Sequence, residues 1–234
     1  MSDKHLSSQF DADLNAISSK VLEMGGLVES QIITAMQALN RFDVEIADRV
    51  IEAEHRLNLM EVQIDEECSN IIARRQPAAR DLRLLMAFSK AVANLERAGD
   101  EAEKIAKRTK RILEDGNART VNITEIKMSG EMAVNLLRHA LDALARLDTV
   151  AAAQIMRDDK AIDEEFRAFV RKLVTYMMED PRTISVGLDY LFIAKAIERI
   201  GDHAKNLAEL IIYIVKGIDV RHVPRDQLER EALG

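Results

Sequence analysis

The sequence has no tryptophan, one cysteine and three prolines among its 234 residues. Aromatic residues make up 4% of it, and its nine glycines are few for an all-β chain that needs many turns. The single cysteine, Cys68, excludes an intrachain disulfide framework and favours a reducing compartment, so we expect a cytoplasmic protein. Residues 1–10 lack the apolar core of a signal peptide, and no apolar run approaches the roughly 20 residues of a membrane span, so we expect no membrane insertion.

Excess positive charge is also missing. The formal net charge is −7 and the pI is about 5.4, whereas a nucleic-acid-binding domain normally carries a basic surface. The sequence contains no glycine-rich phosphate loop, no Gly-x-Ser-x-Gly and no Cys-x-x-Cys. We therefore expect neither nucleic-acid binding, nor an organic cofactor, nor enzymatic activity.

What the chain does have is apolar residues at alternating steps of three and four, which predict helices almost throughout. The expected helices span residues 11–41, 44–75, 79–113, 124–146, 149–178 and 183–216. Pro77 ends the second and Pro181 ends the fifth. The fold class is therefore all-α, with a first three-helix unit at 1–114, a linker at 115–123, a second three-helix unit at 124–218 and a polar tail at 219–234. This order predicts two tandem three-helix bundles related by a pseudo-twofold repeat; one continuous six-helix bundle is the alternative.

The repeat is clearest in one motif. Glu96-Arg97-Ala98-Gly99-Asp100 returns 102 residues later as Glu198-Arg199-Ile200-Gly201-Asp202. A helix places positions i and i+4 on one face, so each copy sets two carboxylates one turn apart. These positions lie off the apolar seam, and we expect them on the outer face of their helices.

A second pair of acid motifs lies on the preceding helices, as Glu61/Asp65 and Asp159/Asp163. Four carboxylates converging from two helices suit a divalent cation such as Mg, Mn, Fe or Zn. The alternative is a solvated face with ordinary salt bridges. The candidate metal ligands are Glu61, Asp65, Glu96, Asp100, Asp159, Asp163, Glu198 and Asp202.

Histidine contributes little to this pattern. His203 follows Asp202 and is a candidate additional ligand. A di-iron oxidase bundle needs two Glu-x-x-His motifs, and the sequence has only Glu52 to His55.

One basic cluster breaks the symmetry between the halves. It lies around Gln76-Pro77 and comprises Arg74, Arg75, Arg80 and Arg83, whereas the second half has only Arg182 in the matching loop. Positive side chains at a helix C-terminus interact favourably with the helix dipole, and this is one explanation for Arg74 and Arg75. The alternative is a partner-binding surface.

Taken together, these strings resemble the PhoU-type phosphate-uptake regulators of bacteria over nearly the whole chain. The most specific are "NLMEVQIDEEC", "RRQPAARDLR", "LERAGDEAEKI" and "LFIAKAIERIGDHAKN". The resemblance implies tandem three-helix bundles that often form homodimers, with iron or zinc clusters on the acid motifs of some relatives. Asp159 stands where the family pattern has glutamate, which shortens that ligand by one methylene.

The resemblance also implies a function. The family acts in phosphate signalling as a negative regulator of the phosphate-starvation response. Its implied partners are the ATPase subunit of the high-affinity phosphate ABC transporter and a sensor histidine kinase. A metal-binding or metal-storage bundle and a purely structural helical scaffold are the alternatives.

Overall fold

Six long helices make up the computed structural model, which describes residues 8–114, 121–221 and 223. They are α1 (Ser8–Arg41), α2 (Val44–Arg75), α3 (Ala79–Glu114), α4 (Thr124–Arg146), α5 (Thr149–Glu179) and α6 (Ile184–Lys216), with a 3-10 turn, η1 (Pro181–Thr183), before α6. Strands are absent from these described ranges, and the predicted all-α fold is confirmed. The predicted linker at 115–123 and the tail at 219–234 lie largely outside the described residues.

Local chemistry sets several helix ends. The Asp43 carboxylate accepts a hydrogen bond from the backbone N–H of Ile46 and caps α2, and Asp148 caps α5 in the same way through Ala151. Gln76, in a left-handed conformation at φ 47°, ends α2 just before Pro77. Gly217, at φ 75°, ends α6. The two halves therefore share the N-cap of their second helix but end that helix differently, since the residue after α5, Asp180, is extended.

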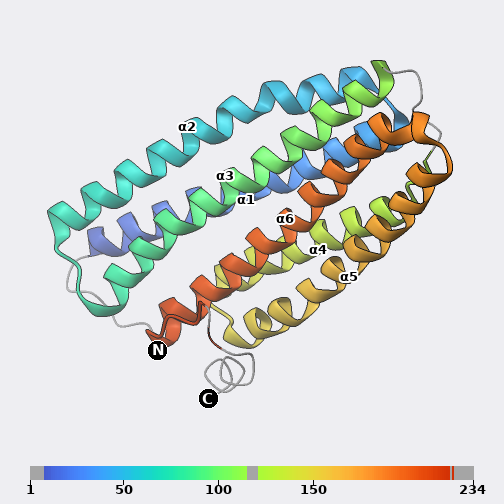
Figure 1. Cartoon of the computed structure of the whole chain (residues 1–234). Coiled ribbons are helices and arrows are strands. Elements are labelled where there is room, and N and C mark those ends of the chain that lie inside the picture. The colour runs from blue at the N-terminus through green and yellow to red at the C-terminus, as the bar shows by residue number, and fades with distance from the viewer. Residues whose placement is uncertain (1–7, 115–120, 222, 224–234) are drawn as a thin grey trace.

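The helices form two three-helix units, α1–α3 and α4–α6, placed side by side (Figure 1). The central pair, α3 and α6, packs along much of its length and runs antiparallel, and α1 also contacts α4. One continuous core of Ile, Leu, Val, Ala and Met side chains runs through both units. Because the halves are joined by this core, the carboxylate motifs of both α3 and α6 are held by one rigid frame.

The apolar residues that recur at steps of three and four along α6 form a buried seam, as the periodicity predicts. Its members are Val186, Tyr190, Ile193, Ile197, Ile200, Ala204, Leu207, Ile211 and Ile214. No helix of the described chain combines the length and the apolarity that crossing a membrane requires.

Candidate metal centres

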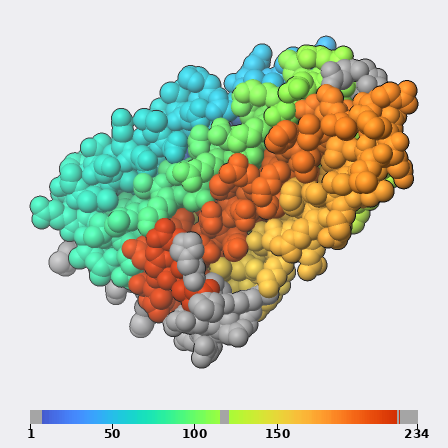
Figure 2. Space-filling view, in the orientation of Figure 1, coloured from blue at the N-terminus to red at the C-terminus, as the bar shows by residue number. Residues whose placement is uncertain are grey.

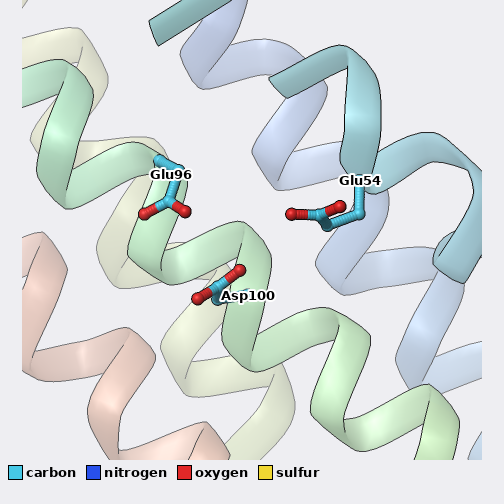
Figure 3. Close-up of side chains that lie close together, drawn as sticks. All are labelled: Glu54, Glu96 and Asp100. Atoms are coloured by element: carbon cyan, nitrogen blue, oxygen red, sulfur yellow. The ribbon is translucent and has the colours of Figure 1, made fainter. Parts of the chain in front are cut away.

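Three carboxylates meet in the first half, between α2 and α3 (Figure 3). One oxygen each from Glu54, Glu96 and Asp100 lies within 4.8 Å of the other two. Glu54 comes from α2, and the other two lie one turn apart on α3. All three side chains are half-buried, so an ion between them would be reached from the surface while the protein shields part of its charge. We call these three residues the first-half triad.

The other two predicted first-half ligands, Glu61 and Asp65, are not part of the triad, although the charge of Glu61 acts on Glu96. Burial raises the pKa of Glu61, and the charges of Asp65 and Asp100 raise it further, which places Glu61 in the electrostatic field of α3. Burial also raises the pKa of Glu96, with further contributions from Asp100, Glu61 and Glu54. The Oδ1 atom of Asp65 is buried and has no hydrogen-bond partner among the described residues.

These observations fit a divalent cation. Burial is the largest cause of the raised pKa values of Glu61 and Glu96, and repulsion from neighbouring carboxylates raises both values further. A cation removes the repulsion and takes the oxygen donors that hard or borderline metals prefer. The first half therefore offers three carboxylate oxygen donors within 4.8 Å of one another.

Glu54 was missing from the sequence prediction. Helical spacing could have identified it. Glu54 lies seven residues before Glu61, and two turns of a helix return a side chain to nearly the same face. The sequence repeat does not point to Glu54, because the aligned position in the second half is Ala152.

The second half differs at Asp159. We expected this residue on an exposed face, and this was wrong: Asp159 is buried, with 3% of its surface exposed. Its Oδ1 lies against Gly201 of α6, where a Cβ atom would approach it to 3.0 Å. The missing side chain of Gly201 makes room for the carboxylate between α5 and α6.

A lysine already neutralises Asp159. The Lys205 Nζ lies 3.6 Å from the Asp159 Oδ2. Burial still raises the pKa of Asp159 to about 6, with Lys205 opposing the rise and the charges of Asp202 and Asp163 adding to it. The residue one repeat earlier than Lys205 is Glu103, which pairs with Lys107 at 2.7 Å. The second-half cluster thus contains a positive charge where the first half has a negative one.

The remaining second-half acids are half-buried. Asp163 and Asp202 act on Asp159 through their charge, while Glu198 pairs with Lys195 at 2.5 Å. In the second half, therefore, the charges of Asp163 and Asp202 act on Asp159, whereas Glu198 forms an ion pair with Lys195.

The two repeated arginines take unequal roles between α3 and α6. Arg199 donates to Glu101 of the other half at 3.1 Å. Arg97 is exposed, and its charge lowers the pKa of Glu61, against the larger effect of burial. The residue one repeat after Glu101 is His203, which lies 3.2 Å from the Asn94 oxygen and whose pKa falls to about 4 through burial and the nearby charges of Arg97 and Arg199. His203 is therefore neutral at pH 7 and bound to α3.

The four clustered arginines divide into two kinds. Arg75 donates to Asp13 of α1 at 2.8 Å, and the Arg83 guanidinium packs beside Gly217. Arg74 and Arg80 are exposed, although Arg74 also donates to a carbonyl of its own helix. Two of the four thus hold neighbouring segments together, and two face solvent.

These features define a class: an all-α protein built from a repeated three-helix unit, with acidic residues gathered on adjacent helices of each unit. Comparison with known families is more specific. The chain belongs to the PhoU family, because the PhoU domain matches it twice, at residues 21–109 and 126–211. The two matches cover the two three-helix units.

Named relatives match over their whole length. The chain is 59% identical over 234 residues to "Phosphate-specific transport system accessory protein PhoU homolog" from Burkholderia sp., covering 100% of both chains. It is 46% identical over 231 residues to "Phosphate-specific transport system accessory protein PhoU" from Escherichia coli K12, covering 99% of this chain and 95% of the relative.

Solved structures share the fold. The crystal structure of PhoU from Pseudomonas aeruginosa matches with a TM-score of 0.86 and 46% identity, covering 89% of this chain and 100% of that one. The phosphate transport system regulatory protein PhoU from Streptococcus pneumoniae matches with a TM-score of 0.84 and 27% identity, covering 90% and 99%.

Proposed function

We propose that this chain is a non-enzymatic accessory regulator of phosphate-specific transport. The observation that carries the proposal is its match, over essentially the full length of each chain, to proteins named for that role. The proposed location is the cytoplasm, where the partners would be the ATPase subunit of the phosphate ABC transporter and a sensor histidine kinase.

In this proposal the chain is an adaptor that represses the phosphate-starvation response when phosphate is plentiful. An adaptor shifts a kinase between states only if it binds one state more tightly than the other. The rigid frame supports such selectivity, because α3 and α6 present fixed side chains from both halves on one continuous core. A homodimer, with two copies of each surface, is part of the proposal. Arg74 and Arg80, which face solvent, are the members of the arginine cluster that we propose for partner contact.

The acid clusters are proposed to bind divalent, iron or zinc ions. The first-half triad is the main site, since its carboxylates gather in half-buried positions, and the nearby charge of Glu61 acts on Glu96. We propose weaker cation binding at Asp159, Asp163, Glu198 and Asp202, because Lys205 already supplies a positive charge there. A bound ion would remove repulsion between α2 and α3 and so stabilise the shape that the partners recognise.

Deleting the gene and measuring alkaline phosphatase activity in excess phosphate tests the regulatory proposal. We expect high phosphatase activity in the deletion strain and repression when the intact gene is restored. Repressed phosphatase in the deletion strain would contradict it.

A metal-storage protein is the second candidate, favoured by the first-half triad alone. Elemental analysis of protein purified without chelator separates the two. Storage predicts many metal ions per chain and no effect of deletion on phosphatase, whereas the adaptor predicts a small fixed number and loss of repression.

A further inference from the structure

An exposed apolar stripe runs along the first half of α6. Ile184, Leu188 and Phe192 follow one another at four-residue steps and are 44%, 42% and 49% exposed. Side chains at this spacing lie on one face of a helix, and two turns span about 12 Å. Figure 2 shows that α6 lies at the surface between α3 and α5, and the exposed fractions place the stripe on the solvent side of this helix.

The first half does not repeat this stripe. One repeat earlier, the same positions of α3 are Leu82, Met86 and Lys90. Leu82 and Lys90 are half-buried, and the Lys90 ammonium lies 5.5 Å from the centre of the Tyr213 ring. Phe192 stays 49% exposed although the Arg108 guanidinium lies over its ring, so contacts within the chain leave much of this face of α6 open.

Positive charge borders the stripe on its α3 side. The Arg108 guanidinium lies 4.3 Å from the centre of the Phe192 ring and 2.8 Å from the buried Asp189. Arg111, with a side chain 59% exposed, lies 3.7 Å from the same carboxylate. Two arginines share one aspartate, so this edge keeps a net positive charge on a chain whose net charge is −7.

We propose that this stripe docks an amphipathic helix of a partner protein, one with large apolar residues at helical spacing and acidic side chains along the edge that meets Arg111. An aromatic side chain beside arginines is the composition typical of binding hot spots. The acidic edge follows from charge complementarity, which steers association and fixes orientation. The inference rests on the proposed adaptor function, because it assigns one of that function's partners to this surface.

The test measures binding of the purified ATPase subunit, and separately of the cytoplasmic part of the sensor kinase, to the full immobilised chain. The test variant is Leu188→Ser with Phe192→Ser. The matched control is Met128→Ser with Val150→Ser, which changes residues 49% and 59% exposed on α4 and α5. Circular dichroism checks that both variants keep the helical content of the wild type.

We expect the α6 variant to bind one of the two partners at least tenfold more weakly, and the control to bind both as the wild type does. Arg111→Glu should weaken the same complex and make it less sensitive to salt. If the wild type binds but the α6 variant binds equally well, this docking surface is wrong and the adaptor function stands. If the wild type binds neither partner, both the docking surface and the proposed adaptor function are wrong. If the α6 variant changes only self-association in sedimentation, the stripe is a contact between copies, and the inference is overturned.

Discussion

At the scale of single residues, glycine controls how closely side chains approach the acid motifs. A Cβ atom on Gly99 would lie 2.5 Å from Leu57 of α2, and one on Gly201 would lie 3.0 Å from Asp159 and from Ile162 of α5. Each glycine precedes the aspartate of its motif, Asp100 or Asp202. The helix-propensity cost of about 1 kcal/mol per glycine is therefore offset by close packing at both clusters.

Replacing Gly99 by alanine should cost stability relative to the same change at Gly26. Gly26 has no atom within 4 Å of its added Cβ, so Gly26→Ala should raise the free energy of unfolding by about 1 kcal/mol. Gly99→Ala forces the buried Leu57 to shift, and we expect it to be about 1–3 kcal/mol less stable than Gly26→Ala. Urea unfolding followed by circular dichroism measures the difference. Equal stabilisation by both changes would contradict the packing argument.

Asp159 should make stability depend on pH. Its pKa is raised to about 6, so the folded state holds the proton more tightly than the unfolded state, in which the value is near the ordinary 3.8. The cost of the buried charge is fully present above about pH 6 and is relieved as the pH falls. In chelator, the wild type should gain about 1 kcal/mol over Asp159→Asn between pH 7 and pH 5. Parallel stability profiles for the two proteins would show that Asp159 titrates normally.

At the scale of helices, α6 carries the main differences between the halves. Lys205 of α6 replaces the acid found at the matching position of α3, and it pairs with Asp159 of α5. The sequence repeat alone predicts two equal metal sites, because it aligns the acids without showing which neighbours face them. The burial of Asp159 against Gly201 depends on how α5 packs on α6, and the spacing of the motif does not show that packing.

Removing Lys205 should improve cation binding in the second half. In a chain with the first-half triad replaced (Glu54→Gln, Glu96→Gln, Asp100→Asn), titration with manganese reports on the second half alone. A positive charge about 4 Å away opposes a cation by roughly 1 kcal/mol or more, so Lys205→Gln should bind manganese on the order of tenfold more tightly.

Lys104→Gln is the matched control for that titration, because Lys104 pairs with Glu101 of α3 at 2.9 Å. It should leave the manganese affinity of the second half unchanged. The same affinity in the Lys205 and Lys104 variants would show that Lys205 does not weaken the site.

The contact between α3 and α6 depends on a buried ion pair. Asp189 is 1% exposed and accepts from Arg108 at 2.8 Å. Arg108→Leu leaves the buried carboxylate with only the more distant Arg111, at 3.7 Å, and we expect a loss of up to about 3 kcal/mol in urea unfolding. Adding Asp189→Asn to this variant should recover part of the loss, since the buried charge is then gone. A double variant no more stable than Arg108→Leu alone would contradict this account.

At the scale of the whole molecule, the fold follows closely from sequence pattern. The predicted helix at 44–75 has the same bounds as α2, and the helix expected from residue 183 begins as η1 followed by α6. Apolar periodicity and two prolines suffice because long helices on a shared core have few alternative arrangements. The functional surfaces follow less directly. The stripe at Ile184, Leu188 and Phe192 was not predicted, because exposure depends on which helix covers which face.

Under the proposed function, regulation of the phosphate response depends on the first-half triad. The most direct test of this dependence is alkaline phosphatase activity, in excess phosphate, of a deletion strain that carries the chain with Glu54→Gln, Glu96→Gln and Asp100→Asn. The control chain carries Glu52→Gln, Glu66→Gln and Asp158→Asn. These three acids also lie on helices but are exposed. With both chains folded and equally abundant, we predict high phosphatase activity for the triad variant and repression for the control. Full repression by the triad variant would contradict the account.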